Sequence, residues 1–331
     1  MSDNLEEFCQ QHGLDFLSLS GTRPYTNGQC DIYRAIGGGR IDSIHLESYG
    51  RFGNNFFQMI NAIWFARKTG IKRIFLPDMR TPFPQGTGVK FDDIEFVFDK
   101  MSFSTDSAAL SGKFFFWWGL GGFLAKKSPK DTVQIIDKYL KPILLPQDVR
   151  TECLLASDIL HIHIRSGDIF SPTTKVNSDY VQPPLAYYQK IIEHMISSAS
   201  AHHVAVVFED RNNPCVNALE TWLNHNAIPN SFLSGTFFED FFRLLGASHI
   251  VAGFGTFVPA IALLSSNLKS IYFFRDSQQT PHLLERGINI NLVLDAHGSY
   301  IKKGAWTNSP GDRELMLSYG SNSLNLRTNC T

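Results

Sequence analysis

The chain has 331 residues, of which 43% are hydrophobic and 18% charged, and its formal net charge at pH 7 is −1. This balance is typical of a globular protein with a large apolar interior and excludes a disordered chain. A net charge near zero provides no overall field that would attract nucleic acid or an anionic membrane, and we expect no nucleic-acid partner. The length exceeds what one hydrophobic core usually serves, and two domains are expected.

The N-terminal residues and the cysteines bear on the compartment. Residues 1–7 are polar and acidic, so we expect no signal peptide, and no run of about 18 uncharged apolar residues predicts a membrane span. The cysteines are scattered and lack metal-ligand spacing, which favours free thiols in a reducing cytosol. A bridge between Cys9 and Cys30 stays open. We therefore expect a cytoplasmic protein. The five cysteines are Cys9, Cys30, Cys153, Cys215 and Cys330.

In the N-terminal half, a polar lead-in of residues 1–40 precedes a strand at 44–47, a glycine-containing loop at 50–54 and a helix over 56–68. A strand at 71–77 follows. Strand, loop, helix and strand form a βαβ unit, which implies a parallel sheet. We expect an N-terminal α/β domain over 41–155, which also contains a helix at 134–145.

The run 113–124 is dense in aromatic residues and is flanked by Lys126 and Lys127. Such a run often packs in the core beneath a loop. The alternative is an exposed surface that contacts an apolar carrier or the face of a membrane, as a peripheral contact. The sequence leaves both interpretations open.

In the second half of the sequence, expected strands and helices alternate again. We expect a C-terminal α/β domain over 156–275, followed by a tail of loops and a short helix over 276–331 that packs on the domains. The continuous apolar run 204–208 predicts a strand buried on both faces. The other expected strands are 160–165, 250–252 and 269–274, and the expected helices are 184–197, 215–224, 239–247 and 259–264.

The run 161–168 places an imidazole, a guanidinium and a carboxylate within a few residues. Alternating His and Ile predict a strand on which His161, His163 and Arg165 share one face, and residues 166–168 then form a turn. Ligands of open α/β sheets bind at the carboxyl ends of strands, and the planar fork of an arginine suits a phosphate. The alternative is a structural ion pair between Arg165 and Asp168.

Three further loops at strand ends carry polar chemistry. Gly50 to Asn54 offers glycines and the free N–H groups of a helix N-terminus to an anion, although turns use glycine freely. Glu209 and Asp210 could accept hydrogen bonds from a ribose or a purine, or form a solvated strand end. In the run 253–257, the Thr256 hydroxyl and nearby N–H groups could hold a phosphate oxygen, or Thr256 could simply cap a helix.

These segments resemble the motifs of a glycosyltransferase superfamily. His163-Ile-Arg-Ser-Gly-Asp168 resembles the His-x-Arg-x-x-Asp motif of the superfamily that contains α1,2-, α1,6- and protein O-fucosyltransferases. Gly50-Arg-Phe-Gly-Asn54 matches the N-terminal motif of the protein O-fucosyltransferases and is close to that of the α1,2 group. Residues 240–257 resemble the third block of the α1,2 group, whose layout is the most similar. Together the motifs span residues 44–275 in the expected order.

The resemblance implies a GT-B-like fold, with two Rossmann-like α/β domains facing across a cleft. It implies an inverting, metal-independent glycosyltransferase that moves L-fucose from GDP-β-L-fucose to a glycan hydroxyl, as in polysaccharide biosynthesis, with no cofactor. The sequence contains no Asp-x-Asp to anchor a metal diphosphate. Two alternatives remain: transfer from another nucleotide sugar, and non-catalytic binding of a nucleotide or carbohydrate. Gly255 and Val258-Pro259-Ala260 depart from the α1,2 pattern, which affects the acceptor linkage.

Roles are implied position by position. Arg165 would bind the β-phosphate and stabilise the departing GDP. His163 would contact the nucleoside, and an acid, Asp210 in preference to Glu209, would contact guanine. Thr256 would lie near the phosphates. The implied donor-binding set is His163, Arg165, Asp210, Glu209, Gly255, Thr256, Phe257, Gly50, Arg51 and Gly53.

On the acceptor side, Asn54 and Arg51 would face the sugar and the acceptor from the N-terminal domain. An acceptor hydroxyl also needs a base within hydrogen-bond reach. Asp168 is the first candidate and Glu47 the second, although some members of the superfamily work without an obvious base. The implied catalytic set is Arg165, Asp168 and Asn54.

Overall fold

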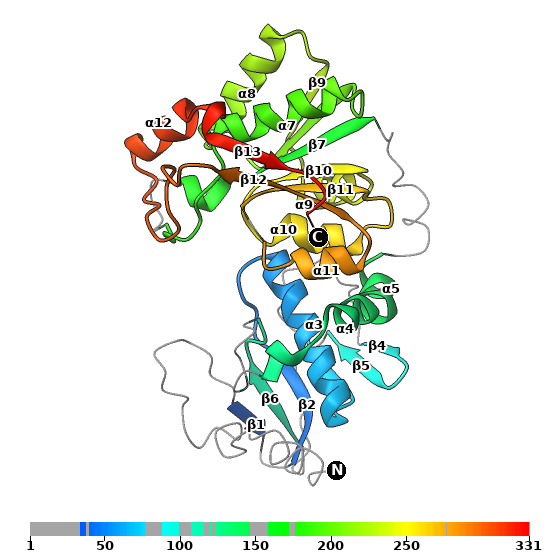
Figure 1. Cartoon of the computed structure of the whole chain (residues 1–331). Helices are drawn as coiled ribbons and strands as arrows, with labels where there is room; N and C mark the ends of the chain where they lie inside the picture. Colours follow the sequence, from blue (N-terminus) through cyan, green and yellow to red (C-terminus); the bar gives the residue numbers. More distant parts are fainter. Residues whose placement is uncertain are drawn as a thin grey trace. The chain divides into compact units, whose positions relative to one another are not determined.

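The computed structural model of the protein describes residues 34–37, 40–76, 88–98, 107–115, 120, 123–145, 158–171, 176–275 and 277–330. The chain divides into two compact units, Met1–Gln147 and Asp148–Thr331, each with its own β-sheet and helices (Figure 1). Parallel strands predominate in both sheets. The expected fold class, α/β with two Rossmann-like units, is confirmed.

The first unit contains a six-stranded sheet with the order β1-β6-β2-β3-β5-β4. Strand β2 lies in its centre and runs parallel to both neighbours, β6 and β3. The edge strands β1 and β4 are antiparallel to theirs. The strands are β1 (Arg34–Gly37), β2 (Arg40–Leu46), β3 (Arg73–Phe75), β4 (Val89–Phe91), β5 (Ile94–Val97) and β6 (Ser107–Gly112).

Helix α3 (Phe52–Thr69) begins four residues earlier than the spacing predicts. Gly50 has a φ of +67°, which turns the chain, and Arg51 is the extended N-cap residue. Gly53 is therefore helical and buried, and of the two glycines in this motif only Gly50 uses the left-handed freedom of glycine. Most of α3 is buried, so the helix has no single apolar face whose spacing would indicate where it begins.

The C-terminal part of the first unit is a nearly continuous helix: α4 (Pro129–Ile135), a π-helical turn (Ile136–Leu140) and α5 (Lys141–Leu144). A capping box between Ser128 and Asp131 starts it earlier than expected. In the aromatic run, Phe114, Leu120, Phe123 and Leu124 are buried, which favours core packing for these residues. Trp117 and Trp118 lie outside the described residues.

The second unit contains a seven-stranded sheet with the order β13-β12-β11-β10-β7-β8-β9. All pairs are parallel except β12 with β13. The chain starts at the central strand β7, adds β8 and β9 on one side and then β10, β11 and β12 on the other. This is the doubly wound order of dinucleotide-binding folds, in which ligands bind where the direction of winding reverses, here between β7 and β10. The strands are β7 (Ile159–Ile164), β8 (His203–Phe208), β9 (Asn230–Leu233), β10 (His249–Ala252), β11 (Ser270–Phe274), β12 (Asn289–Asp295) and β13 (Leu324–Arg327).

Helices cover both faces of this second sheet. Within the unit, α7, α8 and α12 lie on one side and α9, α10 and α11 on the other (Figure 1). Leu160, Ile162 and Ile164 of β7 pack in the core with α7 and α8. His161 and His163 therefore share the opposite face, as the alternation predicts. The helices are α7 (Leu185–Ser197), α8 (Pro214–His225), α9 (Phe237–Leu245), α10 (Phe257–Leu264), α11 (Thr280–Glu285) and α12 (Pro310–Ser318), and a 3-10 turn covers Gly167–Phe170.

Two parts of the second unit differ from expectation. Strand β9 was not expected, because an edge strand with half-buried, partly polar residues lacks a clear apolar pattern. The final residues, expected to be loops and a short helix, also contain β12 and β13, so they extend the sheet. Asn289 and Asn291 interrupt the apolar pattern of β12, although Asn291 is buried.

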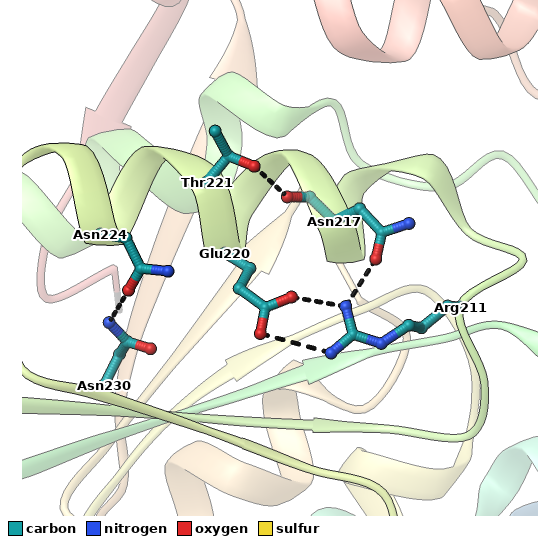
Figure 2. A network of polar contacts seen from close by, with 6 residues as sticks. All are labelled: Arg211, Asn217, Glu220, Thr221, Asn224 and Asn230. Atoms are coloured by element: carbon teal, nitrogen blue, oxygen red, sulfur yellow. Dashed lines mark hydrogen bonds and ion pairs between the residues drawn. The ribbon is translucent and has the colours of Figure 1, made fainter.

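The loop that follows β8 is fastened to α8 by Arg211 (Figure 2). Its guanidinium donates two hydrogen bonds to Glu220, at 2.5 and 3.3 Å, and one to Asn217 at 2.5 Å. The same group lies over the rings of Phe208 and Phe232. This loop carries Glu209 and Asp210, so Arg211 fixes the position of these two acids relative to α8.

No helix among the described residues is long and apolar enough to cross a membrane. Cys215 and Cys330 are free thiols, as expected, and Cys215 is buried. Cys9, Cys30 and Cys153 lie outside the described residues.

Candidate functional site at the carboxyl edge of the second sheet

The loops after β7 and β10 begin side by side at the point where the winding reverses. The Gly253 N–H donates a hydrogen bond to the His163 carbonyl at 3.0 Å. A Cβ at Gly253 would lie 2.9 Å from that oxygen and 3.1 Å from the Arg165 backbone nitrogen. Only glycine fits this approach, which brings the two predicted motifs to one place.

Arg165 is the central cation of this edge. Its side chain is 14% exposed, and Nη2 lies 2.7 Å from Asp168 Oδ1. The ion pair that the sequence offered as an alternative therefore exists, and it orients the guanidinium. The buried Nε has no hydrogen-bond partner within the described part of the chain. A buried donor without an acceptor is costly, which is the situation that an anionic ligand relieves.

His163 lies on the same edge. Burial, reinforced by the nearby Arg165 charge, lowers the pKa of His163 to about 3, so the imidazole is neutral. Its Nδ1 is buried and lacks a partner among the described residues. The ring packs 5.3 Å from that of Phe257, the first residue of α10. A neutral imidazole can take part in a hydrogen bond with a nucleoside without adding charge.

Asp210 holds the loops after β7 and β8 together. Its carboxylate accepts hydrogen bonds from the Ser166 hydroxyl and from the Asn212 N–H, the latter at 2.9 Å. Asn213 in turn donates to Ser166 Oγ at 3.0 Å and to the Arg165 carbonyl at 2.8 Å. Partial burial alone would raise the pKa of Asp210, but these hydrogen bonds lower it below its ordinary value. Asp210 is therefore an ionised carboxylate that fixes Ser166, the residue next to Arg165.

Two further acidic residues lie near this edge: Glu209 directly after β8, and Asp240 on the helix that follows β9. Glu209 is exposed, and its carboxylate lies against Gly167, whose φ is +65°. Asp240 on α9 contacts Arg243 at 3.1 Å. Burial raises the pKa of Asp240 to about 6, with Glu239 and Glu209 adding to the rise and Arg243 opposing it. The sequence placed Asp240 in a motif but not in the site.

Exposed aromatic side chains border this edge and were not expected. Phe238 is 51% exposed, Phe254 41% and Phe237 38%. The rings of Phe237 and Phe257 lie 5.8 Å apart, which connects the exposed pair on α9 with His163. Residues 236–242, Thr-Phe-Phe-Glu-Asp-Phe-Phe, hold a capping box and two Phe-Phe pairs, so an exposed aromatic helix start could have been predicted.

The turn after β10 is open. Gly255 has a φ of +145°, and an added Cβ would meet nothing within 4 Å, so the backbone conformation and not crowding favours glycine. Thr256 occupies the N-cap position of α10 without a capping hydrogen bond from its side chain. The helix-capping role offered as an alternative is thus not seen.

The remaining predicted residues lie in the first unit. Arg51 is exposed at the N-cap of α3, and Asn54 is half-buried in its first turn. A Cβ at Gly50 would lie 2.5 Å from Asn54 Nδ2, so this amide folds back over the glycine. Gly50, Arg51, Gly53 and Asn54 thus gather at one helix start, separate in the chain from the donor-binding residues of the second unit.

No family model matches the chain, and no curated protein matches it. A crystal structure of POFUT1 in complex with GDP is similar with a TM-score of 0.42 and 13% identity, over 71% of this chain and 98% of that chain.

Proposed function

We propose that the protein is a glycosyltransferase whose second unit binds the diphosphate of a nucleotide sugar between β7 and β10. The observation that carries the proposal is the buried Nε of Arg165, which lacks a hydrogen-bond partner among the described residues and lies at the reversal point of a doubly wound sheet. A diphosphate oxygen would accept from Nε while Asp168 keeps Nη2 in place. The N–H groups at the start of α10 lie on the neighbouring loop and suit the same anion.

The proposed donor is GDP-β-L-fucose, because the His163–Asp168 and Gly50–Asn54 motifs resemble those of fucosyltransferases. His163 would contact the nucleoside next to Phe257. The acid after β8, Asp210 in preference to Glu209, would accept hydrogen bonds from guanine or ribose, and the Ser166 hydroxyl donates to the Asp210 carboxylate and so fixes its position.

The reaction transfers the sugar without a metal in this proposal. As the bond between the anomeric carbon and the β-phosphate oxygen breaks, its electron pair moves to the diphosphate and the sugar becomes oxocarbenium-like. Arg165 stabilises the charge that develops on the leaving oxygens. Preorganised donors of this kind contribute about 3 kcal/mol of transition-state stabilisation each. The acceptor hydroxyl attacks from the opposite face, which inverts the anomeric configuration.

Nucleotide binding tests the proposal directly. Ligands that bind only the folded protein raise its melting temperature, so GDP, GMP and UDP can be compared by thermal shift and calorimetry. GDP should stabilise the protein more than GMP because of its second phosphate. Arg165→Lys should weaken GDP binding about tenfold and slow GDP release from GDP-fucose about 100-fold or more, since a point charge cannot replace the fork.

Arg327→Lys is the matched control, because Arg327 is an exposed arginine on the edge strand β13 of the same sheet. Equal binding of GDP by the wild type and Arg165→Lys would overturn the proposal. Tighter binding of UDP would point to another nucleotide sugar, and binding of GDP without any release from GDP-fucose to a non-catalytic protein.

A further inference from the structure

The first unit carries a group of cations where helix α3 ends and helix α4 begins. Arg67 and Lys68 lie in the last turn of α3. Lys126 and Lys127 directly precede α4, and Lys130 lies in its first turn. The two helices pack against each other. We call these five residues the α3–α4 basic face; Lys127 is half-buried and the other four are exposed.

Aromatic contacts connect the two sides of this face. The ring of Trp64 on α3 lies 4.7 Å from that of Phe123. Lys68 Nζ lies 5.9 Å from the centre of the Trp64 ring, and Lys126 Nζ lies 5.7 Å from that of Phe123. The two lysines therefore lie over a pair of rings that touch, although they are more than 50 residues apart in the chain.

Little negative charge opposes these cations. Arg67, Lys68, Lys126 and Lys130 make no ion pair with any residue that the structure describes. Asp131 lies among them, but it accepts hydrogen bonds from the Ser128 N–H and hydroxyl, at 3.0 and 2.6 Å. Burial alone would raise the pKa of Asp131, but these hydrogen bonds and the charges of Lys68 and Arg67 lower it below its ordinary value.

The stability of the fold does not account for the cations beside α4. Lys130 lies in the first turn of the helix, where the helix dipole disfavours a positive charge. Lys127 Nζ donates to Thr132 Oγ1 at 2.9 Å, and burial lowers the pKa of Lys127 to about 8 although Asp131 opposes the shift. Like charges that gather at a cost to the fold are typical of a site that binds something.

The burial of the two rings narrows the choice of anionic partner. Trp64 is 4% exposed and Phe123 is 3% exposed, so neither can serve as the platform on which single-stranded nucleic acid stacks its bases. Lysine stems over apolar rings, with ammonium groups in solvent, suit a surface of charged lipid headgroups. Because the whole chain has a net charge of −1, the attraction is local and would orient this face towards an anionic surface.

We propose that the α3–α4 basic face binds the surface of a membrane that contains anionic lipids. The cations of the first unit supply the attraction, whereas the described aromatic residues beneath them stay in the core. Each basic residue close to such a surface raises the partition coefficient about fivefold. The contact is therefore reversible and sensitive to salt. This inference does not depend on the proposed function.

The experiment measures cosedimentation of the full chain with lipid vesicles, in the absence of any nucleotide. Vesicles with about 30% phosphatidylglycerol should bind the protein about tenfold or more tightly than pure phosphatidylcholine, and about 0.5 M NaCl should remove most of the difference. Lys126→Gln/Lys130→Gln should bind the anionic vesicles about 25-fold more weakly. Lys126→Arg/Lys130→Arg, which keeps the charge, should bind like the wild type. Lys302→Gln/Lys303→Gln is the matched control, because both lysines are exposed in the second unit.

Each outcome either supports the inference or overturns it. Weaker binding by Lys126→Gln/Lys130→Gln than by the control variant supports it. Equal binding of the wild type to neutral and anionic vesicles would overturn it, as would an equal loss in the control variant. Loss of binding in the arginine variant would also overturn it, because charge is then not the cause. Binding to heparin but not to anionic vesicles would assign the face to a soluble polyanion instead of a membrane.

Discussion

Acid should destabilise this protein through its buried histidines, and His161 offers the cleanest test. His161 is 3% exposed in the central strand β7, and its Nδ1 has no partner within the described residues. Burial lowers the pKa of His161 from 6.5 to about 4, with smaller contributions from His203 and His249, while a hydrogen bond to the Ile159 backbone opposes the shift. Protonation of His161 is therefore less favourable in the folded protein than in the unfolded chain.

The free energy of unfolding depends on pH because the pKa of His161 differs between the folded and the unfolded state. Because the folded pKa is the lower one, the stability contributed by neutral His161 is complete above pH 6.5. It is lost as the pH falls towards 4. At pH 5 the unfolded chain gains about 2 kcal/mol from this one site, and below pH 4 about 3 kcal/mol. His163, whose pKa is lowered to about 3, adds to the same loss.

The assay compares the wild type with His161→Leu, which removes the titrating ring at similar volume. Urea unfolding is measured at pH 7.5 and pH 5 with the fluorescence of the buried Trp306 in the second unit, the other tryptophans being replaced by phenylalanine in both proteins. The stability lost between the two pH values should be about 2 kcal/mol smaller in His161→Leu. His297→Gln, on the surface, is the matched control. A difference under about 0.5 kcal/mol would refute the reasoning.

Three further substitutions near the carboxyl edge of the second sheet should change the stability of the protein. Gly253→Ala forces a Cβ against the His163 carbonyl, so it should lower stability by about 1–3 kcal/mol and GDP affinity more than tenfold; an unchanged melting temperature would contradict the close approach. Ser166→Ala leaves Asp210 and a backbone N–H without their partner, which should cost about 1–3 kcal/mol in urea unfolding. Because the pKa of Asp240 is raised to about 6, its ionised form destabilises the fold above that pH, so Asp240→Asn should raise the melting temperature at pH 7.5 and by less at pH 4.5.

The order of strands and helices was predictable where the apolar pattern is strong. The run 204–208 and the helix 185–197 were predicted to within a residue or two, because each is bounded by clear polar or proline residues. The start of α3 and the strand β12 were not. Burial of α3 on nearly all sides, and the asparagines of β12, remove the periodicity on which such predictions depend.

The candidate site was predictable in its strand-end residues and less so in its contacts. Arg165 and His163 follow from position and chemistry alone. That Asp210 braces Ser166, and that Asp240 lies near Glu209, depends on pairing between strands distant in sequence. Single-sequence reasoning does not determine that pairing. In the first unit, the hydrogen bonds that Ser111 makes with His45 and with Glu47 also depend on such pairing, because β2 and β6 lie more than 60 residues apart.

The central position of β7 also affects how the protein is made. On a ribosome, β8 emerges soon after β7, but the opposite edge pairs with β10, about 90 residues further along. At about 5–20 residues per second, that edge stays unpaired for about 5–20 seconds. During this time the nascent second unit exposes an open strand edge that invites association with other chains. Conditions that slow translation between residues 165 and 249 should therefore lower the yield of native protein more than equal delays after residue 295.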